Sequence, residues 1–186
     1  MKTFCFLCLT LMLTGCATLS REQCQRGDWY GLGVADGQLG QPASRIDQHL
    51  RACAEYGITP DNRQYMEGRA QGLAEYCRLD NAFETGLRGQ RYQGVCPPAV
   101  DGLFDRYNAS AYEVYRLRRE LDSVDDSLTS LESRLMDRSL TDENRRSIRS
   151  DIRELDRHRD RLRDDLHFSE LQLDRMEDEA RALNQP

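Results

Sequence analysis

The sequence has almost no lysine and no apolar run long enough to cross a membrane. Lys2 is the single lysine, and every later basic residue is an arginine. The apolar run from Phe4 to Leu13 is too short to span a bilayer core of about 30 Å as a helix. Acidic residues outnumber basic ones, 32 to 26, and no basic stripe with interleaved aromatics is present. We therefore expect no nucleic-acid partner, because binding to a polyanion depends on a basic surface.

A processing motif follows the apolar run, which itself fits the h-region of an export signal. The residues Leu13-Thr14-Gly15-Cys16 resemble a bacterial lipobox. The resemblance implies a signal peptide at residues 1–15 and diacylation of Cys16, with palmitate among the chains, since several chains anchor more firmly than one. Ala17 follows the cysteine instead of Asp, and this favours an outer-membrane protein that faces the periplasm. The alternative is an ordinary buried N-terminal helix.

Four cysteines remain after this processing: Cys24, Cys53, Cys77 and Cys96. An even number in an exported chain predicts two disulfides, and the C-x-x-C spacing of metal sites is absent. Cys53 and Cys77 lie near the ends of consecutive predicted helices, which are far apart in an antiparallel pair. Two pairings stay open: Cys24–Cys53 with Cys77–Cys96, which we favour, and Cys24–Cys77 with Cys53–Cys96.

Glycine and cysteine are concentrated in the first half of the chain. Residues 98–186 contain no cysteine and one glycine, Gly102. We predict an all-α protein with a lipidated N-terminus and short linker at residues 16–23, a small disulfide-stapled helical domain at 24–97, and a long antiparallel coiled-coil hairpin at 98–186. The boundary falls at Pro97-Pro98, because proline ends one element and can start the next helix.

Capping residues predict short helices in the small domain. Asp28 and Ser44 precede expected helices at 29–39 and 45–56, and Gly57 ends the second. Pro60-Asp61 opens a third, to about residue 78, and Asn81 a fourth, to about residue 89. Residues 92–95 are expected to be extended.

The stretch from Gly27 to Gly40 holds five glycines and looks like a phosphate loop. A phosphate loop needs a preceding strand, and an exported chain meets little ATP. Instead, an aromatic residue followed by glycines on one helical face occurs three times: Trp29-Gly33-Gly37, Tyr65-Gly68-Gly72 and Phe83-Gly86-Gly89. Each helical glycine costs roughly 1 kcal/mol of propensity, so we expect close helix packing in return.

Apolar residues at alternating steps of three and four predict the hairpin. One series runs from Leu103 to Leu135 and another from Ile148 to Leu183. Facing residues of an antiparallel pair have a constant sum, and here the sums are all about 280, as for Leu131 with Ile148 or Leu103 with Met176. Each arm is on the order of 55 Å long. A long parallel dimer is the alternative.

The two ends of the hairpin have different compositions. The tip, residues 138–144, breaks the apolar rhythm, and its exposed side chains are expected to be Arg138, Leu140, Asp142 and Arg145. At the base, extra apolar residues lie beside the seam, and there we expect the small domain to dock: Phe104, Ala111, Tyr115, Phe168 and Leu171.

No catalytic or metal-binding constellation is visible. His49 and Cys53 could form half a metal site, but a hydrogen-bonded histidine beside a disulfide is the simpler interpretation. Asp28, Asp36 and Asp61 could supply the paired carboxylates of a glycosidase, yet Asp28 and Asp61 are explained as helix caps. We therefore expect no catalytic residue, no metal and no small-molecule cofactor, and we expect that the protein is not an enzyme.

The first half resembles an uncharacterised family of proteobacterial envelope lipoproteins with a domain of unknown function. The resemblance rests on Cys24…Gly27-Asp28-Trp29-Tyr30…Gly33…Asp36-Gly37, His49…Cys53…Gly57, Pro60-Asp61, Tyr65…Gly68…Gly72…Tyr76-Cys77, Asn81-Ala82-Phe83…Gly86…Gly89 and Tyr92-Gln93-Gly94-Val95-Cys96-Pro97. It implies an envelope location and a small disulfide domain that excludes the coiled coil, and it brings no activity, substrate or cofactor.

Together these features favour a non-enzymatic outer-membrane lipoprotein. It would be held in the membrane by its N-terminal lipid and would present the hairpin to a periplasmic protein partner or to peptidoglycan. The alternative is a glycan-binding or inhibitor-type module in which Trp29, Tyr30, Tyr65, Tyr76 and Tyr92 form the binding face, although packing in the core explains these aromatics more simply. A cell-wall hydrolase has the least support.

Overall fold

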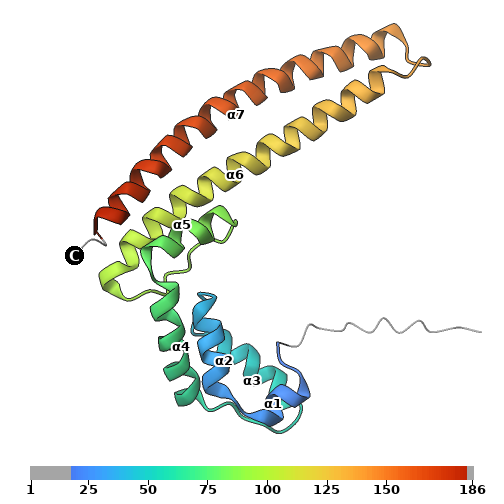
Figure 1. Ribbon diagram of the computed structural model, residues 1–186. Coiled ribbons are helices and arrows are strands. Elements are labelled where there is room, and N and C mark those ends of the chain that lie inside the picture. The colour runs from blue at the N-terminus through green and yellow to red at the C-terminus, as the bar shows by residue number, and fades with distance from the viewer. Residues whose placement is uncertain (1–17, 184–186) are drawn as a thin grey trace, which may run out of the picture.

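The structure, a computed structural model, describes residues 18–183; the expected signal peptide and Cys16 lie outside these residues. The described part is all-α, which confirms the expected fold class. Its helices are α1 (Arg21–Arg26), α2 (Trp29–Gln38), α3 (Arg45–Ala54), α4 (Asn62–Tyr76), α5 (Leu79–Leu87), α6 (Pro98–Leu135) and α7 (Asp142–Leu183). Figure 1 shows a small bundle of α1–α4 and, beside it, a long hairpin of α6 and α7.

Side-chain caps start several of these helices. The Asp28 carboxylate accepts from the Gly31 backbone N–H at 2.9 Å, which confirms the expected cap of α2. The α1 helix was not expected, although Ser20 and Gln23 form a reciprocal capping box whose S-x-x-Q pattern is visible in the sequence. Ser44 makes no side-chain cap bond, contrary to expectation.

Several boundaries of the short helices differ from those expected, most of them by one or two residues. The α3 helix ends at Ala54, before Gly57 with its left-handed φ of 69°. The α5 helix begins at Leu79 rather than at Asn81. The Asn81 amide instead donates to the carbonyl of Tyr76 at 2.8 Å, so it satisfies the end of α4. Residues 92–95 form neither helix nor strand.

The α2 and α4 helices run parallel and touch backbone to backbone. A Cβ atom on Gly33 would lie 2.1 Å from the carbonyl oxygen of Tyr65, and one on Gly68 would lie 2.0 Å from that of Tyr30. Gly37 and Gly72 are equally constrained, by the carbonyls of Arg69 and Val34. Two of the three aromatic-and-glycine stretches are thus explained by the interlocking faces of α2 and α4. In the third, Gly86 packs against Ala111 and the Asn108 carbonyl of α6, but Gly89 lies beyond the end of α5 with a φ of 82°, so the prediction that it shares the helical face is wrong.

The small bundle has its own core. It consists of Leu19, Cys24, Trp29, Cys53 and Tyr65, all less than 9 % exposed. The Cys24–Cys53 disulfide ties α1 to α3 inside this core.

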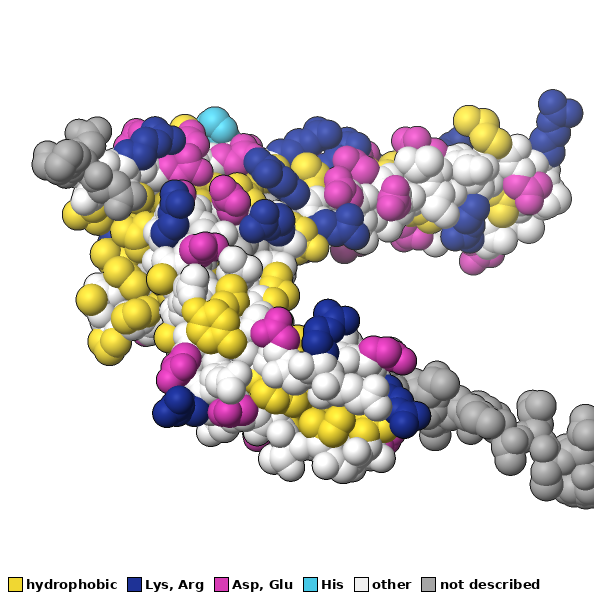
Figure 2. All heavy atoms as spheres, turned by 60° about the horizontal axis from the view of Figure 1, so that its bottom comes forward, with side chains coloured by type: hydrophobic (Ala, Val, Ile, Leu, Met, Phe, Trp, Pro, Cys, Tyr) yellow, Lys and Arg dark blue, Asp and Glu magenta, His cyan; other side chains and the backbone are white. Residues whose placement is uncertain are grey.

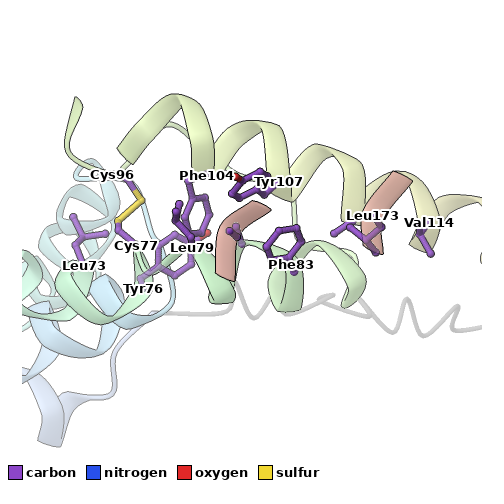
Figure 3. Close-up of a cluster of buried hydrophobic side chains, with 13 residues drawn as sticks. Leu73, Tyr76, Cys77, Leu79, Phe83, Cys96, Phe104, Tyr107, Val114 and Leu173 are labelled. Atoms are coloured by element: carbon purple, nitrogen blue, oxygen red, sulfur yellow. A yellow bond between two sulfur atoms is a disulfide. The ribbon is translucent and has the colours of Figure 1, made fainter. Parts of the chain in front are cut away.

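A second core joins the end of α4 to the hairpin (Figure 3). Tyr76 and Phe83 meet Phe104 and Tyr107 of α6 there, and Leu173 of α7 packs on the same cluster. The Cys77–Cys96 disulfide lies at its edge, so the pairing is the one that we favoured. The change in composition at Pro97 therefore does not separate two cores, because residues on both sides of it share this one. The α5 helix packs with α6 and α7 to form a three-helix bundle at the base of the hairpin.

Above this base, α6 and α7 pack as the expected antiparallel coiled coil. Leu117, Val124, Leu128 and Leu162 are buried along the seam. Ion pairs cross between the arms from Arg106 to Glu179 and from Arg118 to Glu170. Figure 2 shows acidic and basic side chains interleaved along this arm, whereas apolar ones gather where the arm joins the rest of the molecule.

Two of the apolar residues expected at the base are not part of it. Phe104 and Ala111 are fully buried, but Phe168 is 64 % exposed and Leu171 is 48 % exposed. The reason is that α5 packs mainly on α6, so the outer side of α7 has no neighbouring helix. The apolar periodicity indicated which helices meet but not which side of the hairpin α5 covers.

Candidate functional site

A buried polar cluster joins three helices of the small bundle. The Oδ2 atom of Asp36, on α2, accepts from the hydroxyl of Tyr65, on α4, at 2.8 Å. The same oxygen lies 2.8 Å from Nε2 of His49, on α3. The exposed fractions are only 9 % for Asp36, 3 % for His49 and 0 % for Tyr65. The buried carboxylate of Asp36 is therefore stabilised by hydrogen bonds from two neighbouring helices.

The electrostatics of this cluster keep Asp36 ionised at neutral pH. Burial alone would raise the pKa of Asp36, but hydrogen bonds from His49 and Tyr65, together with nearby positive charge that includes Arg45, outweigh burial and lower it. Burial and the bond to the carboxylate raise the pKa of Tyr65. The ionised carboxylate only accepts hydrogen bonds, so His49 donates through Nε2.

The same histidine fastens the start of the described chain. The Oγ1 atom of Thr18 lies 3.0 Å from Nδ1 of His49. Leu19 follows at 4 % exposure, and Ser20 then caps α1. The chain is thus held to the bundle from its first described residue. Nothing in the sequence singles out Thr18 or Leu19, because each is an ordinary residue in a segment that has no periodicity.

The order hydroxyl, imidazole, carboxylate is also the order of a hydrolytic triad. Here, however, His49 is almost completely buried, and the Asp36 oxygen is shared with Tyr65. A catalytic imidazole must reach the proton that it transfers in a bound substrate. We interpret Thr18, His49 and Asp36 as a structural network.

The hypothetical half metal site of His49 and Cys53 is not formed, because Cys53 is in the disulfide with Cys24. Within residues 18–183, no group of three or more His, Cys, Asp or Glu side chains is arranged to hold a metal ion. Of the three candidate glycosidase carboxylates, Asp28 and Asp61 cap α2 and α4, and Asp36 belongs to the buried cluster.

A second buried polar group closes the loop between α2 and α3. Arg69 of α4 is 9 % exposed, and its Nε and Nη2 donate to the carbonyl of Gln41 at 3.1 and 2.7 Å. A guanidinium group makes such forked contacts without losing its charge. Arg69 therefore fixes a loop that has no regular structure of its own.

The five aromatics proposed as a binding face do not share one. Trp29 and Tyr65 are buried in the first core, and Tyr76 is buried in the second. Tyr30 is 40 % exposed, and its hydroxyl bonds to Gln71. Tyr92 is half-buried, and its hydroxyl donates to Asp101. Packing in the core accounts for the three buried rings, as the simpler interpretation held.

A pocket of about 420 Å³ lies between the loop after α5 and the first turns of α6. The guanidinium of Arg91 lies 4.6 Å from the ring centre of Tyr112, so an aromatic face and a cation meet at this wall. Burial and the bond to Asp101 raise the pKa of Tyr92 to about 12, so its hydroxyl stays protonated at neutral pH. The residues that line the pocket are Arg91, Tyr92, Asp105, Asn108, Ala109, Tyr112 and Glu113.

Asn108 holds the wall of this pocket together. It is 2 % exposed; its Oδ1 accepts from the Tyr92 backbone N–H at 2.8 Å, and its Nδ2 donates to Thr85 Oγ1 and to the Gln90 carbonyl, both at 3.0 Å. Sequence reasoning missed this residue. The neighbouring residues Asp105, Arg106 and Ser110 are also polar, so the local sequence does not single out Asn108.

The hairpin tip is ordered by its own side chains. Arg145 donates to the carbonyls of Leu135 and Asp137 at 2.9 and 2.7 Å and so caps the end of α6. Asp137 accepts from the backbone and hydroxyl of Ser139, and these bonds lower its pKa.

The predicted tip residues divide into two kinds. Arg138 and Asp142 are exposed, whereas Leu140 and Arg145 are half-buried. Met136, which was not among the predicted residues, is 81 % exposed. The tip thus presents one large apolar side chain among charged ones.

Residues 28–113 match the family described as "Protein of unknown function (DUF2799)". This match confirms the expected resemblance to a domain family of unknown function. No curated protein and no solved structure matches the chain.

The end of the matched segment agrees with the extent of the second core better than with the change in composition at Pro97. It begins at the cap of α2 and continues past Pro97 to Glu113 in α6. It therefore includes Tyr107, Asn108 and Ala111, the α6 residues on which α5 packs, although the coiled coil was expected to lie outside the family.

Within residues 18–183, no helix is both long enough and apolar enough to span a membrane.

Proposed function

We propose that the protein is a non-enzymatic, lipid-anchored protein of the outer membrane that presents its hairpin to a partner in the periplasm. Cys16 carries the lipid, and the partner is a periplasmic protein or the peptidoglycan layer. The observation that carries this proposal is the capped, exposed hairpin tip around Met136. A rigid rod of two paired helices is better suited to contacting a distant partner than to catalysing a reaction.

Beyond its base, the α6–α7 arm has the plain architecture of a coiled coil, and this supports an adaptor role. Its seam is filled by aliphatic side chains, and its surface pairs are solvent-exposed, as in Arg118 with Glu170. Exposed ion pairs contribute little stability, typically less than about 1 kcal/mol. These pairs make the surface of the arm polar, and the tip adds the exposed side chain of Met136 among charged residues.

Photo-crosslinking in intact cells tests the partner. A photoreactive residue at Met136 or Leu140 should give a discrete adduct. The matched control is Asp126, which is exposed on the same arm but away from the tip. Adducts at Asp126 equal to those at the tip would contradict the proposal.

Metabolic labelling with a palmitate analogue tests the anchor. The wild-type protein should incorporate the label and fractionate with the outer membrane. The variant Cys16→Ser should lose both properties, since Cys16 is the proposed site of acylation. Labelling that persists in Cys16→Ser would contradict the lipoprotein assignment.

A second candidate function is ligand binding at the pocket beside Tyr112. The pocket lies within the matched segment, and its volume is in the range of small-ligand sites. The aromatic ring, the Arg91 cation and the nearby carboxylates would suit a sugar or a short peptide of the cell wall. Sedimentation of the protein with purified peptidoglycan tests this candidate: Tyr112→Ala should reduce binding, whereas Met136→Ala should not.

A further inference from the structure

We propose that a surface patch of Arg21 and Tyr56, beside Thr18, lies against the lipid headgroups of the membrane that holds the protein. This inference rests on the proposed lipidation of Cys16. It adds an orientation to the anchor: one particular face of the small bundle is apposed to the bilayer.

The first step is the length of the tether. Only Ala17 separates Cys16 from Thr18. Consecutive Cα atoms are about 3.8 Å apart, so Cys16 lies within about 8 Å of Thr18. Thr18 is bonded to His49, and Leu19 is buried in the first core. The folded bundle therefore begins almost at the acylated residue and cannot move far from the bilayer surface.

The second step is the chemistry of the neighbouring surface. The guanidinium of Arg21 lies 5.7 Å from the ring centre of Tyr56, and both side chains are exposed, Tyr56 by 39 %. Arg21 opens α1 directly after the segment of Thr18, Leu19 and Ser20. Tyrosine is favoured at the boundary between apolar and aqueous phases, and arginine binds phosphate while its stem lies along apolar groups.

The third step is the choice of occupant. A tether this short brings the bilayer within reach of the patch in every molecule, whereas a protein partner would have to compete with it for the same space. The acyl chains supply most of the membrane affinity, because their buried methylene groups provide the apolar area. Arg21 and Tyr56 therefore set the orientation of the bundle rather than the strength of binding.

Fluorescence quenching in vesicles tests the orientation. Lipidated, full-length Tyr56→Trp would be reconstituted in vesicles of phosphatidylethanolamine and phosphatidylglycerol, with and without brominated acyl chains. Trp29 is the single natural tryptophan and is 6 % exposed, so it supplies a constant background. The matched control is Met136→Trp at the tip. We expect loss of the added emission for Tyr56→Trp and no loss for Met136→Trp.

A longer tether provides the second arm of the test. Insertion of about ten Gly and Ser residues between Ala17 and Thr18 adds a flexible coil of roughly 17 Å. The insertion should restore most of the emission of Tyr56→Trp while acylation continues. If the original Tyr56→Trp protein is acylated but is quenched no more than Met136→Trp, the inference is wrong. If no acyl chain is incorporated, the proposed lipoprotein function itself fails.

Discussion

The small bundle and the hairpin are both helical, but they are held together by different contacts. In the bundle, α2 and α4 touch through their backbones, and a single Cβ atom at Gly33 would meet a carbonyl oxygen at 2.1 Å. In the hairpin, α6 and α7 touch through rows of leucine and valine side chains, while Gly102 has open space around it. The first contact depends on the identity of each residue, and the second depends on a repeated pattern.

This difference determines how each region responds to change. A coiled-coil seam that loses one contact becomes less stable but keeps its geometry, because the remaining heptads hold the helices in register. A glycine contact has no such redundancy, because any side chain separates the two backbones. The single tryptophan, Trp29, lies in the bundle core, whereas most of the helical residues belong to α6 and α7. Tryptophan fluorescence and far-UV circular dichroism therefore report on the two regions separately.

The largest effect is expected for Gly33→Leu. The new side chain must displace the carbonyl of Tyr65 and the backbone of Arg69, so α2 and α4 have to separate. We expect a loss of about 3 kcal/mol or more in the stability of the bundle. The Trp29 fluorescence transition should move to a much lower temperature, while the circular dichroism transition of the hairpin changes little.

The matched control is Gly102→Ala in α6. Gly102 is helical and exposed, and no atom from outside its own stretch of helix backbone lies within 4 Å of the position that a new methyl group would take. Alanine should therefore stabilise the hairpin by about 1 kcal/mol through helix propensity. Replacing a helical glycine is thus expected to lower the stability of the bundle and to raise that of the hairpin. An unchanged fluorescence transition in Gly33→Leu would refute the backbone contact.

The next largest effect is expected for the disulfide that joins the two regions. Cys77 and Cys96 link the end of α4 to the segment that enters α6. Replacing both by serine should destabilise the second core by about 3 kcal/mol, the usual cost for a loop of this size. The transitions of the bundle and the hairpin should then separate further in temperature.

Replacing Cys24 and Cys53 by serine is the comparison for this variant. That disulfide lies wholly within the first core. We expect its loss to lower the fluorescence transition and leave the hairpin transition in place. Equal effects of the two double variants on both transitions would mean that the molecule unfolds as one unit.

The same contrast explains what could be predicted from the sequence. The hairpin follows from the spacing of Leu117, Val124 and Leu128, because a heptad pattern is local and repeated. The glycine pattern indicated that α2 and α4 each have a face for close packing. It did not indicate that these two helices pack against each other. In both cases the signal is a face of a helix, which sequence periodicity can reveal.

The remaining features depend on contacts that are distant in sequence. Asn108 is bonded to Tyr92, Thr85 and Gln90, and no local pattern indicates that an amide should occupy this position. The exposure of Phe168 depends on which side of the hairpin α5 covers. His49 was expected to be hydrogen-bonded beside a disulfide cysteine, and it is, but its partners Asp36, Tyr65 and Thr18 come from separate segments that no local pattern connects.

An intermediate effect is expected for Asp36→Asn in the bundle. Both hydrogen bonds end on Oδ2, so the asparagine carbonyl oxygen can still accept from His49 and from Tyr65, but as a neutral acceptor. A hydrogen bond to a charged group contributes about 1 kcal/mol more than a neutral one, so the two weakened bonds should together cost about 2 kcal/mol. The matched control is Asp28→Asn, because asparagine caps a helix about as well as aspartate. Fluorescence-detected unfolding should show the loss in Asp36→Asn only.

The pH dependence of the same variant tests the sign of the electrostatics. The folded-state pKa of Asp36 is lowered, so its contribution to stability is complete above the ordinary aspartate value, near pH 4, and is lost as the pH falls through the folded-state pKa. The wild-type bundle should therefore lose stability relative to Asp36→Asn below about pH 4. Parallel pH profiles for the two proteins would contradict the assignment.

The smallest effect is expected for the ion pairs on the hairpin. Arg118 and Glu170 approach to 2.7 Å across the arms, but their side chains are 54 % and 39 % exposed. A double-mutant cycle with Arg118→Ala and Glu170→Ala should give a coupling energy below about 1 kcal/mol. By contrast, Leu117→Ala, one residue away in the seam and 3 % exposed, should cost about 2–5 kcal/mol. A coupling energy as large as the effect of Leu117→Ala would mean that charge pairs, rather than the apolar seam, hold the two arms together.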